Sequence, residues 1–376
     1  MKVVVLEHFT SSPAFRGGAA IRAEGRAMRD AIVADLVAIP GVGVTVLRSE
    51  ACPPAASGRL EIIRVPRAGG AGRGREFLFR AALRCADAAL VIAPESGGVL
   101  ERLVRIVEEE RRTLLGPAGA FVRISADKLE TFRRLRSAGV TTPDTEAIPF
   151  ADAAFRLAPR PRPFVLKPRD GCGGQGVILV RRGDRLGAAI ARVGRATRRK
   201  DFLMQPFIAG APASVAFVSG EDRLLPLALC RQRLGPERRL AYLGGDAPWR
   251  TAGATAAIEL ARRAIESVDP DGRCARGYLG VDLVLGPSGP VVIEVNPRLT
   301  SSYLGLRRVS RINPAGLILA AATGEALPPR VTMTGVCGFL ADGTVETVRR
   351  KRRAGPARRS GRRGWSFSAG ISAASI

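Results

Sequence analysis

Short apolar runs alternate with helix-spaced segments in the first part of the chain. Gly, Pro and Ser separate these segments, as is typical of turns. Strand-like runs occur at residues 3–6, 42–47, 60–65, 88–93 and 114–116, and helical spacing occurs at 22–37 and 99–110. Strands that alternate with helices predict a βαβ-type sheet with helices on its faces. We therefore expect an N-terminal α/β domain at residues 1–117.

The pattern changes after residue 118, where hairpins replace the alternation of strands and helices. One helix is expected at 126–138, with Ser125 as its N-cap and Gly139 at its end. A proline-rich linker at 159–163 follows. The expected hairpins pair 164–167 with 177–180, 202–206 with 214–218, and 281–285 with 291–295, and a further helix is expected at 256–268. This region, 118–330, is therefore expected to be α+β.

Beyond residue 330, a short segment at 331–348 leads into a basic tail at 349–376. The tail has nine Arg and Lys residues between positions 349 and 363 and no acidic residue. Its Gly, Ser and like charges oppose compact structure, so we expect disorder. The net charge of +25 raises the alternative of a protein that binds nucleic acid or another polyanion through this tail. With 5% aromatic residues, no base-stacking platform is visible, and we expect nucleic-acid binding to be nonspecific at most.

Composition argues against several other classes. A hydrophobic fraction of 46% is too high for a disordered chain. No apolar stretch reaches the ~18 residues of a membrane span, and Glu7 interrupts the first apolar run where a signal peptide would continue. We expect a cytoplasmic protein with no membrane partner. The six cysteines include no CxxC pair, which argues against a disulfide framework or a zinc site.

The chain uses lysine rarely, which makes each lysine informative. Only five of its 59 basic residues are lysine, and the other 54 are arginine. Lysine differs from arginine where a compact ammonium must fit among phosphate oxygens. Lys128 lies beside an expected helix start, and Lys167 ends an expected strand. Both are therefore candidates for phosphate binding.

Residues 171–176 (Gly-Cys-Gly-Gly-Gln-Gly) match the GxGxxG pattern of dinucleotide-binding proteins. That pattern requires a helix after the last glycine, because the pyrophosphate rests on the helix N-terminus. Here the apolar run 177–180 predicts a strand, so the dinucleotide interpretation fails. The loop is either an ordinary hairpin tip or a mobile loop whose N–H groups approach an anion. Lys167, four residues before the loop, favours the phosphate-binding interpretation.

The hairpin at 281–295 gathers polar residues on an otherwise apolar pair of strands. Its turn at 286–289 places Asp282 opposite Glu294, and Glu294 and Asn296 share a face with Val292. Two carboxylates and an amide oxygen are hard ligands that suit Mg²⁺. Arg298 follows on the same face, where it could hold a phosphate or carboxylate. The alternative is a solvated hairpin face, which its apolar flanks disfavour.

Four segments, in this order, resemble the motifs of the ATP-grasp ligases. Residues 125–128 are similar to the first-lysine region of that superfamily, and 164–168 with the glycine loop to its second lysine and phosphate-covering loop. Residues 203–210 are similar to its adenine hinge, and 294–298 to its metal-binding motif. The likeness extends over residues 1–330 and implies a pre-ATP-grasp α/β domain followed by ATP-grasp lobes.

The resemblance implies an ADP-forming carboxylate–amine ligase. A carboxylate attacks the γ-phosphate of ATP to give an acylphosphate, and an amine then forms the amide and releases phosphate. Segments 21–28, 92–96, 212–215 and 296–303 are most similar to the tyramine–glutamate ligase family of methanofuran synthesis. The implied substrates are the γ-carboxylate of glutamate and tyramine or a related aromatic amine. A different ATP-grasp amino-acid ligase stays open as an alternative function. A homodimer stays open as the oligomeric state.

The resemblance also implies a role for each motif residue. Lys128 and Lys167 would neutralise the α- and β-phosphates, the glycine loop would exclude water, and Arg298 would hold the acylphosphate. The implied nucleotide-binding residues are Lys128, Lys167, Gly171, Gly173, Gly174, Gly176, Gln205, Phe207 and Ile208. The implied ligands of two Mg²⁺ or Mn²⁺ ions are Asp282, Glu294 and Asn296. Pro212 stands where relatives often carry a ribose-binding acid, which leaves the ribose contacts open.

His8 is the only histidine, and it follows the first expected strand. Parallel sheets present ligands near the carboxyl ends of their strands. A structural role and a substrate-facing role therefore both stay open for His8. Cys172, inside the glycine loop, has no base that can be placed beside it, so we expect no nucleophilic role.

Overall fold

The computed structural model describes residues 1–13, 18–49, 58–66, 73–157, 162–235 and 240–350. These residues form three β-sheets with helices on their faces, which confirms the expected mixed α/β class. In the described part of the chain, no helix is long and apolar enough to cross a membrane.

The N-terminal sheet is parallel, with the strand order β3-β2-β1-β4-β5. Its strands are β1 (Lys2–Glu7), β2 (Gly43–Arg48), β3 (Leu60–Arg64), β4 (Ala88–Ile92) and β5 (Thr113–Leu114), and its helices are α1 (Ala19–Val37), α2 (Arg73–Arg84) and α3 (Val99–Glu109), with the 3₁₀ turn η1 (Ser96–Gly98) before α3. Val3 and Val5 pack against α1, whereas Val4 and Leu6 pack on the other face with α2 and α3. Strands covered on both faces have continuous apolar runs. The expected βαβ-type sheet is confirmed.

The small sheet is antiparallel, with the order β6-β9-β7-β8. Its strands are β6 (Glu146–Pro149), β7 (Phe164–Pro168), β8 (Ile178–Val180) and β9 (Asp201–Pro206), accompanied by η2 (Phe150–Asp152), α6 (Ala153–Arg156) and α7 (Leu186–Gly194). Leu166, Ile178 and Val193 are buried in the core that α7 shares with this sheet. Two helices, α4 (Gly119–Ala126) and α5 (Lys128–Ser137), precede it in the chain.

The large sheet has seven antiparallel strands in the order β14-β13-β10-β11-β12-β15-β16. Its strands are β10 (Ala211–Ser219), β11 (Leu224–Leu234), β12 (Tyr242–Ala247), β13 (Gly277–Gly286), β14 (Gly289–Asn296), β15 (Gly335–Leu340) and β16 (Val345–Arg350), and its helices are α8 (Ala254–Val268), α9 (Ser302–Val309) and α10 (Pro314–Thr323). Phe217 packs with α8, whereas Val218 packs with α9 and α10 on the other face. The second face shares its core with α1. The N-terminal domain and the large sheet are therefore joined by one apolar core.

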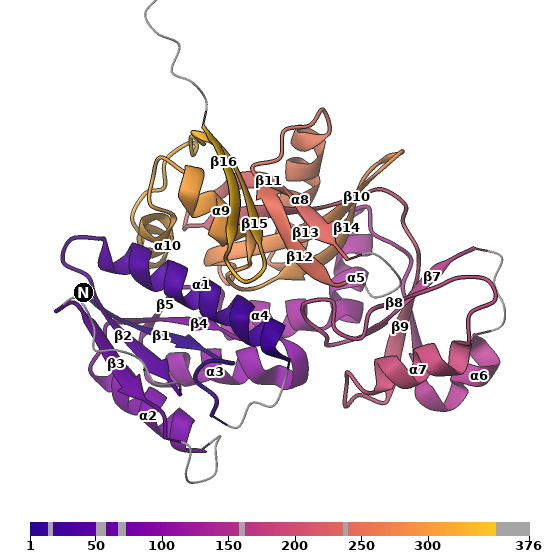
Figure 1. Cartoon of the computed structure of the whole chain (residues 1–376), viewed down its shortest axis with the longest axis horizontal. Helices are drawn as coiled ribbons and strands as arrows, with labels where there is room; N and C mark the ends of the chain where they lie inside the picture. The colour runs from indigo at the N-terminus through magenta and orange to yellow at the C-terminus, as the bar shows by residue number, and fades with distance from the viewer. Residues whose placement is uncertain (14–17, 50–57, 67–72, 158–161, 236–239, 351–376) are drawn as a thin grey trace, which may run out of the picture.

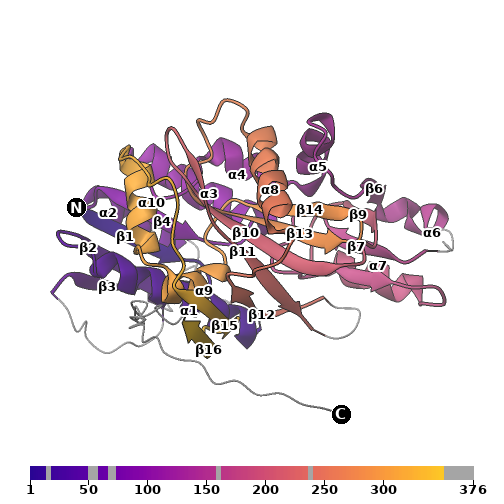
Figure 2. The ribbon, with the colours of Figure 1, turned by 90° about the horizontal axis from the view of Figure 1, so that it is seen from above.

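Figure 1 shows the N-terminal sheet and the small sheet at opposite ends of the molecule, with the large sheet between them. Figure 2 shows the same order from a second direction. Strands β15 and β16 contain most of the segment at 331–348 and continue to Arg350. Residues 351–376 of the basic tail and residues 158–161 at the proline-rich linker lie outside the described residues. Residues 349 and 350, the first two of the tail, belong to β16, so the expected disorder is wrong for them. The expected disorder of residues 351–376 stays a prediction.

Three local expectations are wrong, each for a physical reason. The hairpins at 164–180 and 281–295 form, but residues 202–206 do not pair with 214–218. Instead β9 lies between β6 and β7 in the small sheet, whereas β10 joins the large sheet. The segment between β9 and β10 therefore crosses from one sheet to the other, which strand propensity alone does not reveal.

The single helix expected at 126–138 is two helices, α4 and α5, which are separated at Asp127. Asp127 has extended backbone angles, and its side chain accepts from the backbone N–H groups of Leu129 and Glu130. Ser125 lies inside α4, so the N-cap of α5 is Asp127 instead. An aspartate favours a cap over a helix interior because its carboxylate satisfies free N–H groups.

Val292 and Glu294 were expected on one face of the hairpin, but they lie on different faces. Asp282 does pair with Glu294, but Leu283 pairs with Val292, so Ile293 is an extra residue in β14. This β-bulge changes the alternation of side chains. Val292 packs with α8, whereas Ile293 and Glu294 both line the large cavity described below.

Candidate active site

A cavity of about 370 Å³ lies between the small sheet and the large sheet. Every nucleotide-binding and metal-binding residue implied by the resemblance lines this cavity except Gly176. Gly176 has φ +72°, and a Cβ there would lie 2.5 Å from the Cβ of Ala196 and 2.7 Å from Pro168. It therefore serves the close packing at the base of the glycine loop rather than the cavity wall.

Lys128 reaches the cavity from the first turn of α5, where its side chain is buried. Its ammonium lies 2.8 Å from Glu294 Oε1 and also donates to the carbonyl oxygen of Gly171. Burial alone would lower the pKa of Lys128, but the carboxylates of Glu294 and Glu95 raise it. The residue is therefore a fixed positive charge beside the glycine loop.

Lys167 reaches the same cavity from β7, and only 4% of it is exposed. Burial, together with the nearby charge of Lys128, lowers its pKa to about 8, although Glu294 opposes that shift. Two buried ammonium groups thus share one carboxylate. Phosphate oxygens of an anionic ligand such as a polyphosphate would give both ammonium groups further negative partners.

Asp282, Glu294 and Asn296 come together on β13 and β14. Asn296 Nδ2 donates to Asp282 Oδ2 at 3.1 Å, and Gln232 Nε2 donates to Asp282 Oδ1 at 2.9 Å. Burial and the charge of Glu294 raise the pKa of Asp282 to about 7. The two carboxylates therefore repel each other in a buried setting, which a cation between them would relieve.

This donor set fits Mg²⁺. The described residues contain no group of three His, Cys, Asp or Glu side chains that could hold a metal ion by themselves. Asp282 and Glu294 supply two carboxylates, and the amide of Asn296, whose nitrogen is directed at Asp282, has its oxygen available as a third ligand. Mg²⁺ is commonly held by one or two carboxylates and completed by water and substrate phosphates.

Arg298 follows the end of β14 and pairs with a residue that sequence reasoning missed. Its Nε donates to Glu95 Oε1 at 2.8 Å, and Nη1 donates to the carbonyl of Leu299 at 3.3 Å. Glu95 follows β4 and is 2% exposed. The position of Glu95 just after the carboxyl end of a parallel strand could have indicated its role, because ligand-binding residues gather at such ends.

The glycine loop contacts the N-terminal domain next to Glu95. The hydroxyl of Ser96 donates to the sulfur of Cys172 at 3.5 Å, and the N–H of Gly97 donates to Asp170 at 3.2 Å. Burial and the carboxylate of Glu95 raise the pKa of the Cys172 thiol. A raised pKa favours the neutral thiol, which is a poor nucleophile.

The expected adenine hinge borders the cavity where the chain passes from β9 to β10. Gln205 is buried on β9, and its Nε2 donates to the hydroxyl of Thr145 at 2.6 Å. That hydrogen bond uses one of the two N–H donors of the amide and fixes its orientation, so that its oxygen can accept from a donor on a ligand. Phe207, Ile208 and Pro212 follow along the same wall.

Among the residues that line the cavity without having been expected there, three carry polar groups of interest. They are Glu24 on α1, Tyr242 on β12 and Ser301 before α9. The hydroxyl of Ser301 donates to Glu24 Oε1. Within the described part of the chain, Glu24 forms no ion pair, so its carboxylate is available to a cationic group.

His8 lies outside the cavity lining. Its Nδ1 is 3.0 Å from Nη1 of Arg75, which can only donate, so Nδ1 must be an unprotonated acceptor. Burial, with the charges of Arg75 and Arg102, lowers its pKa to about 3. This arrangement favours the structural role over the substrate-facing one.

Comparison with known proteins matches two families to this chain. Residues 42–122 match the pre ATP-grasp 3 domain, and residues 125–302 match the ATP-grasp domain. A protein named tyramine–L-glutamate ligase from Methanocaldococcus jannaschii is 28% identical over 65% of this chain and 66% of its own length. A protein named probable alpha-L-glutamate ligase from Xanthomonas campestris is 32% identical over 54% of this chain and 67% of its own length. The chain thus spans about two thirds of the length of these relatives.

Among solved structures, an ATP-grasp superfamily protein from Archaeoglobus fulgidus has a TM-score of 0.63 and 23% identity. The match covers 90% of this chain and 92% of the other. The likeness in fold therefore extends over nearly the whole length of both chains.

Proposed function

The chain belongs to the ATP-grasp superfamily of ligases, and we propose that it is an ADP-forming carboxylate–amine ligase. The observation that carries this proposal is that one cavity is lined by Lys128, Lys167, Asp282, Glu294 and Asn296, with Lys128 paired to Glu294. Buried ammonium groups together with hard oxygen ligands suit a nucleoside triphosphate with its divalent cation. The polyanion-binding alternative depends on a tail that lies largely outside the described residues.

The side chains of the cavity divide the work of phosphoryl transfer. ATP supplies the phosphoryl group that activates the carboxylate, and Mg²⁺ or Mn²⁺, proposed as two ions on Asp282, Glu294 and Asn296, would offset its charge. Lys128 and Lys167 neutralise the α- and β-phosphates. The glycine loop covers the phosphates and excludes water, while Gln205 and the backbone at Phe207 and Ile208 contact the adenine.

Arg298 is suited to the activated carboxylate. Its Nε is held by Glu95 and its Nη1 donates to the carbonyl oxygen of Leu299, which leaves Nη2 as a donor for an anion bound in the cavity. An acylphosphate formed by attack of the carboxylate on the γ-phosphate would be held there until an amine attacks its carbonyl carbon. The products are then an amide, ADP and phosphate.

We propose glutamate as the carboxylate substrate, activated at its γ-carboxylate, and tyramine or a related aromatic amine as the acceptor. Both curated relatives described above carry glutamate in their names, and one carries tyramine. Glu24 supplies a carboxylate on the cavity wall for the ammonium group that either substrate carries. A different ATP-grasp amino-acid ligase is the second candidate, favoured by the 32% identity to the alpha-L-glutamate ligase relative.

The proposal retains the remaining expectations from the sequence. The first is a division into domains at 1–117 and 118–330, followed by a segment at 331–348 and a tail at 349–376. The others are a cytoplasmic location and a place in a methanofuran-type pathway. Whether the protein forms a homodimer stays an open question. None of them is needed for the chemistry of the cavity.

The test is ADP release over a panel of acid and amine pairs, with mass spectrometry of the amide product. We expect glutamate with an aromatic amine to raise ADP release above the rate with ATP alone. Activity only with two amino acids would favour the second candidate. Asn296→Ala, which removes one proposed metal ligand from a paired strand, should abolish the release while the unfolding temperature stays close to that of the unaltered protein.

A further inference from the structure

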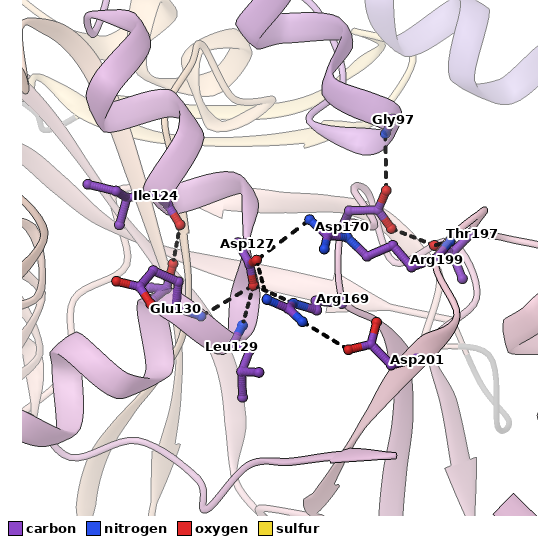
Figure 3. Close-up of polar contacts among 11 residues, drawn as sticks. Gly97, Ile124, Asp127, Leu129, Glu130, Arg169, Asp170, Thr197, Arg199 and Asp201 are labelled. Atoms are coloured by element: carbon purple, nitrogen blue, oxygen red, sulfur yellow. Dashed lines mark hydrogen bonds and ion pairs between the residues drawn. The ribbon is translucent and has the colours of Figure 1, made fainter. Parts of the chain in front are cut away.

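A polar network links α5, the base of the glycine loop and the start of β9 (Figure 3). Arg169 donates from Nε to Asp127 Oδ1 at 2.7 Å and from Nη2 to Asp127 Oδ2 at 2.6 Å. Its Nη1 donates to Asp201 Oδ2 at 2.9 Å. None of these three residues lines the cavity. The network therefore supports the site without contacting a ligand in it.

The paired residues lie within two positions of the two lysines along the chain. Asp127 immediately precedes Lys128, and Arg169 follows Lys167 by two residues. The backbone N–H of Lys128 also donates to the carbonyl of Arg169 at 3.1 Å. Asp127 in addition caps α5 through Leu129 and Glu130, so the same carboxylate fixes the helix start. One ion pair therefore connects the two backbone segments that carry Lys128 and Lys167.

We propose that the ion pair between Asp127 and Arg169 is a positioning device that holds the ammonium groups of Lys128 and Lys167 at the separation that phosphate binding requires. The inference rests on the proposed nucleotide-binding role of those lysines. Two ammonium groups buried beside one carboxylate repel each other, so the segments that carry them need a fixed link. A planar guanidinium that forms two parallel hydrogen bonds fixes orientation as well as distance.

Asp170 extends the same link to the glycine loop. Its Oδ2 accepts from the backbone N–H of Gly97, and its Oδ1 accepts from the hydroxyl of Thr197 at 2.6 Å. Figure 3 shows Asp170 between Gly97 of the N-terminal domain and Thr197, which precedes β9 of the small sheet. The residue that starts the loop is thus fixed on both sides, directly beside Arg169. Loosening Arg169 would release the loop base together with Lys167.

The test uses two single variants that each remove one property. Asp127→Asn keeps an oxygen that can cap α5 but removes the charge that Arg169 needs. Arg169→Lys keeps the positive charge but loses the two parallel hydrogen bonds. In calorimetry with Mg·ADP as the probe, each variant should raise Kd about tenfold or more. The double variant should bind about as weakly as either single one, because each change breaks the Asp127–Arg169 pair, and the other contacts, Arg199 with Asp127 and Arg169 with Asp201, belong to the same network.

A second ion pair in the chain supplies a matched control. Arg307 and Asp35 form the same two-point contact between α9 and α1, with side chains 16% and 14% exposed, against 21% and 16% for Arg169 and Asp127. Asp35→Asn and Arg307→Lys should lower the unfolding temperature by a comparable amount and leave the Kd for Mg·ADP within twofold. Thermal unfolding of all variants then separates positioning from general stability.

Three outcomes overturn the inference. A Kd within twofold of the unaltered protein in Arg169→Lys and Asp127→Asn would show that the pair does not position the lysines. An equal rise in the control variants would show that the effect is structural. Failure of the unaltered protein to bind Mg·ADP at all would overturn the proposed nucleotide-binding function, and this inference with it.

Discussion

The guanidinium of Arg298, just after β14, is held by the buried carboxylate of Glu95, which belongs to the N-terminal domain, with Nε 2.8 Å from Oε1. The second oxygen of Glu95 is buried and has no hydrogen-bond partner within the described residues. A charge-assisted hydrogen bond between two buried groups is strong, and it fixes the direction of the guanidinium. The N-terminal domain therefore orients a side chain of the catalytic cavity.

Removing the charge of Glu95 should weaken that orientation. In Glu95→Gln the side chain keeps its size but faces Arg298 with a neutral amide. We expect kcat to fall about tenfold or more, as for a displaced positioning contact, while the KM for ATP changes little. Steady-state kinetics with ATP and the amide-forming substrates measures both.

Glu110→Gln is the control for Glu95→Gln. Glu110 pairs with Arg80 in the same domain, with its side chain 15% exposed, but it lies outside the cavity lining. The kcat and KM values of the Glu110→Gln variant should equal those of the unaltered enzyme. If Glu95→Gln behaves in the same way as this control, Arg298 does not depend on Glu95.

Glu24 should contribute to the binding of an amine-bearing substrate. Glu24→Gln preserves an acceptor for the hydroxyl of Ser301 but removes the negative charge from the cavity wall. We expect the KM for either the amino acid or the acceptor amine to rise about tenfold, which is the scale of one charge-assisted hydrogen bond. Measuring the two KM values separately identifies which ammonium group is bound, and the KM for ATP should stay constant.

Asp30→Asn on the same helix is the control, because Asp30 pairs with Arg29 and Arg48 away from the cavity. Unchanged KM values for both substrates in Glu24→Gln would place the ammonium site elsewhere.

The single histidine predicts a pH dependence of stability. The pKa of His8 in the folded protein is about 3, against 6.5 for an unperturbed imidazole. Between these values the unfolded chain binds a proton that the folded chain does not, so stability falls as the pH drops below 6.5. Between pH 7 and pH 5 the contribution of His8 to the free energy of unfolding should decrease by about 2 kcal/mol.

Two measurements check this prediction. Nuclear magnetic resonance of the one imidazole should show no titration between pH 5 and pH 8. Denaturant unfolding at pH 7 and pH 5 should show a smaller loss of stability in His8→Asn, whose amide oxygen takes the position of Nδ1 and can still accept from Arg75. A titration midpoint near 6.5 would mean that His8 is exposed to solvent or that Arg75 does not face it.

Local sequence patterns predicted the residues that line the cavity better than the residues that hold those side chains in place. The lysines and the acidic hairpin were identifiable because their chemistry depends on residue type and on neighbours a few positions apart. The bulge at Ile293 was not, since hydrophobic alternation contains no sign of one extra residue. Glu95 and Arg169 were missed for a different reason: their partners, Arg298 and Asp127, are 203 and 42 residues away in the sequence. Long-range pairs of charges leave no local pattern.

Lys167 gives the sharpest test of the cavity, because the chain otherwise uses arginine for nearly all its positive charges. If Lys167 supplied charge alone, an arginine at this position would serve equally well. The side chain is instead buried at 4% exposure beneath the glycine loop, where a wider planar group would displace the loop and misalign its donors. We expect Lys167→Arg to lower kcat/KM for ATP at least ~10²-fold. Lys200→Arg, at an exposed position outside the cavity, should leave kcat/KM unchanged. Equal and small effects for both substitutions would remove Lys167 from the phosphate site and leave the glycine loop as an ordinary hairpin tip.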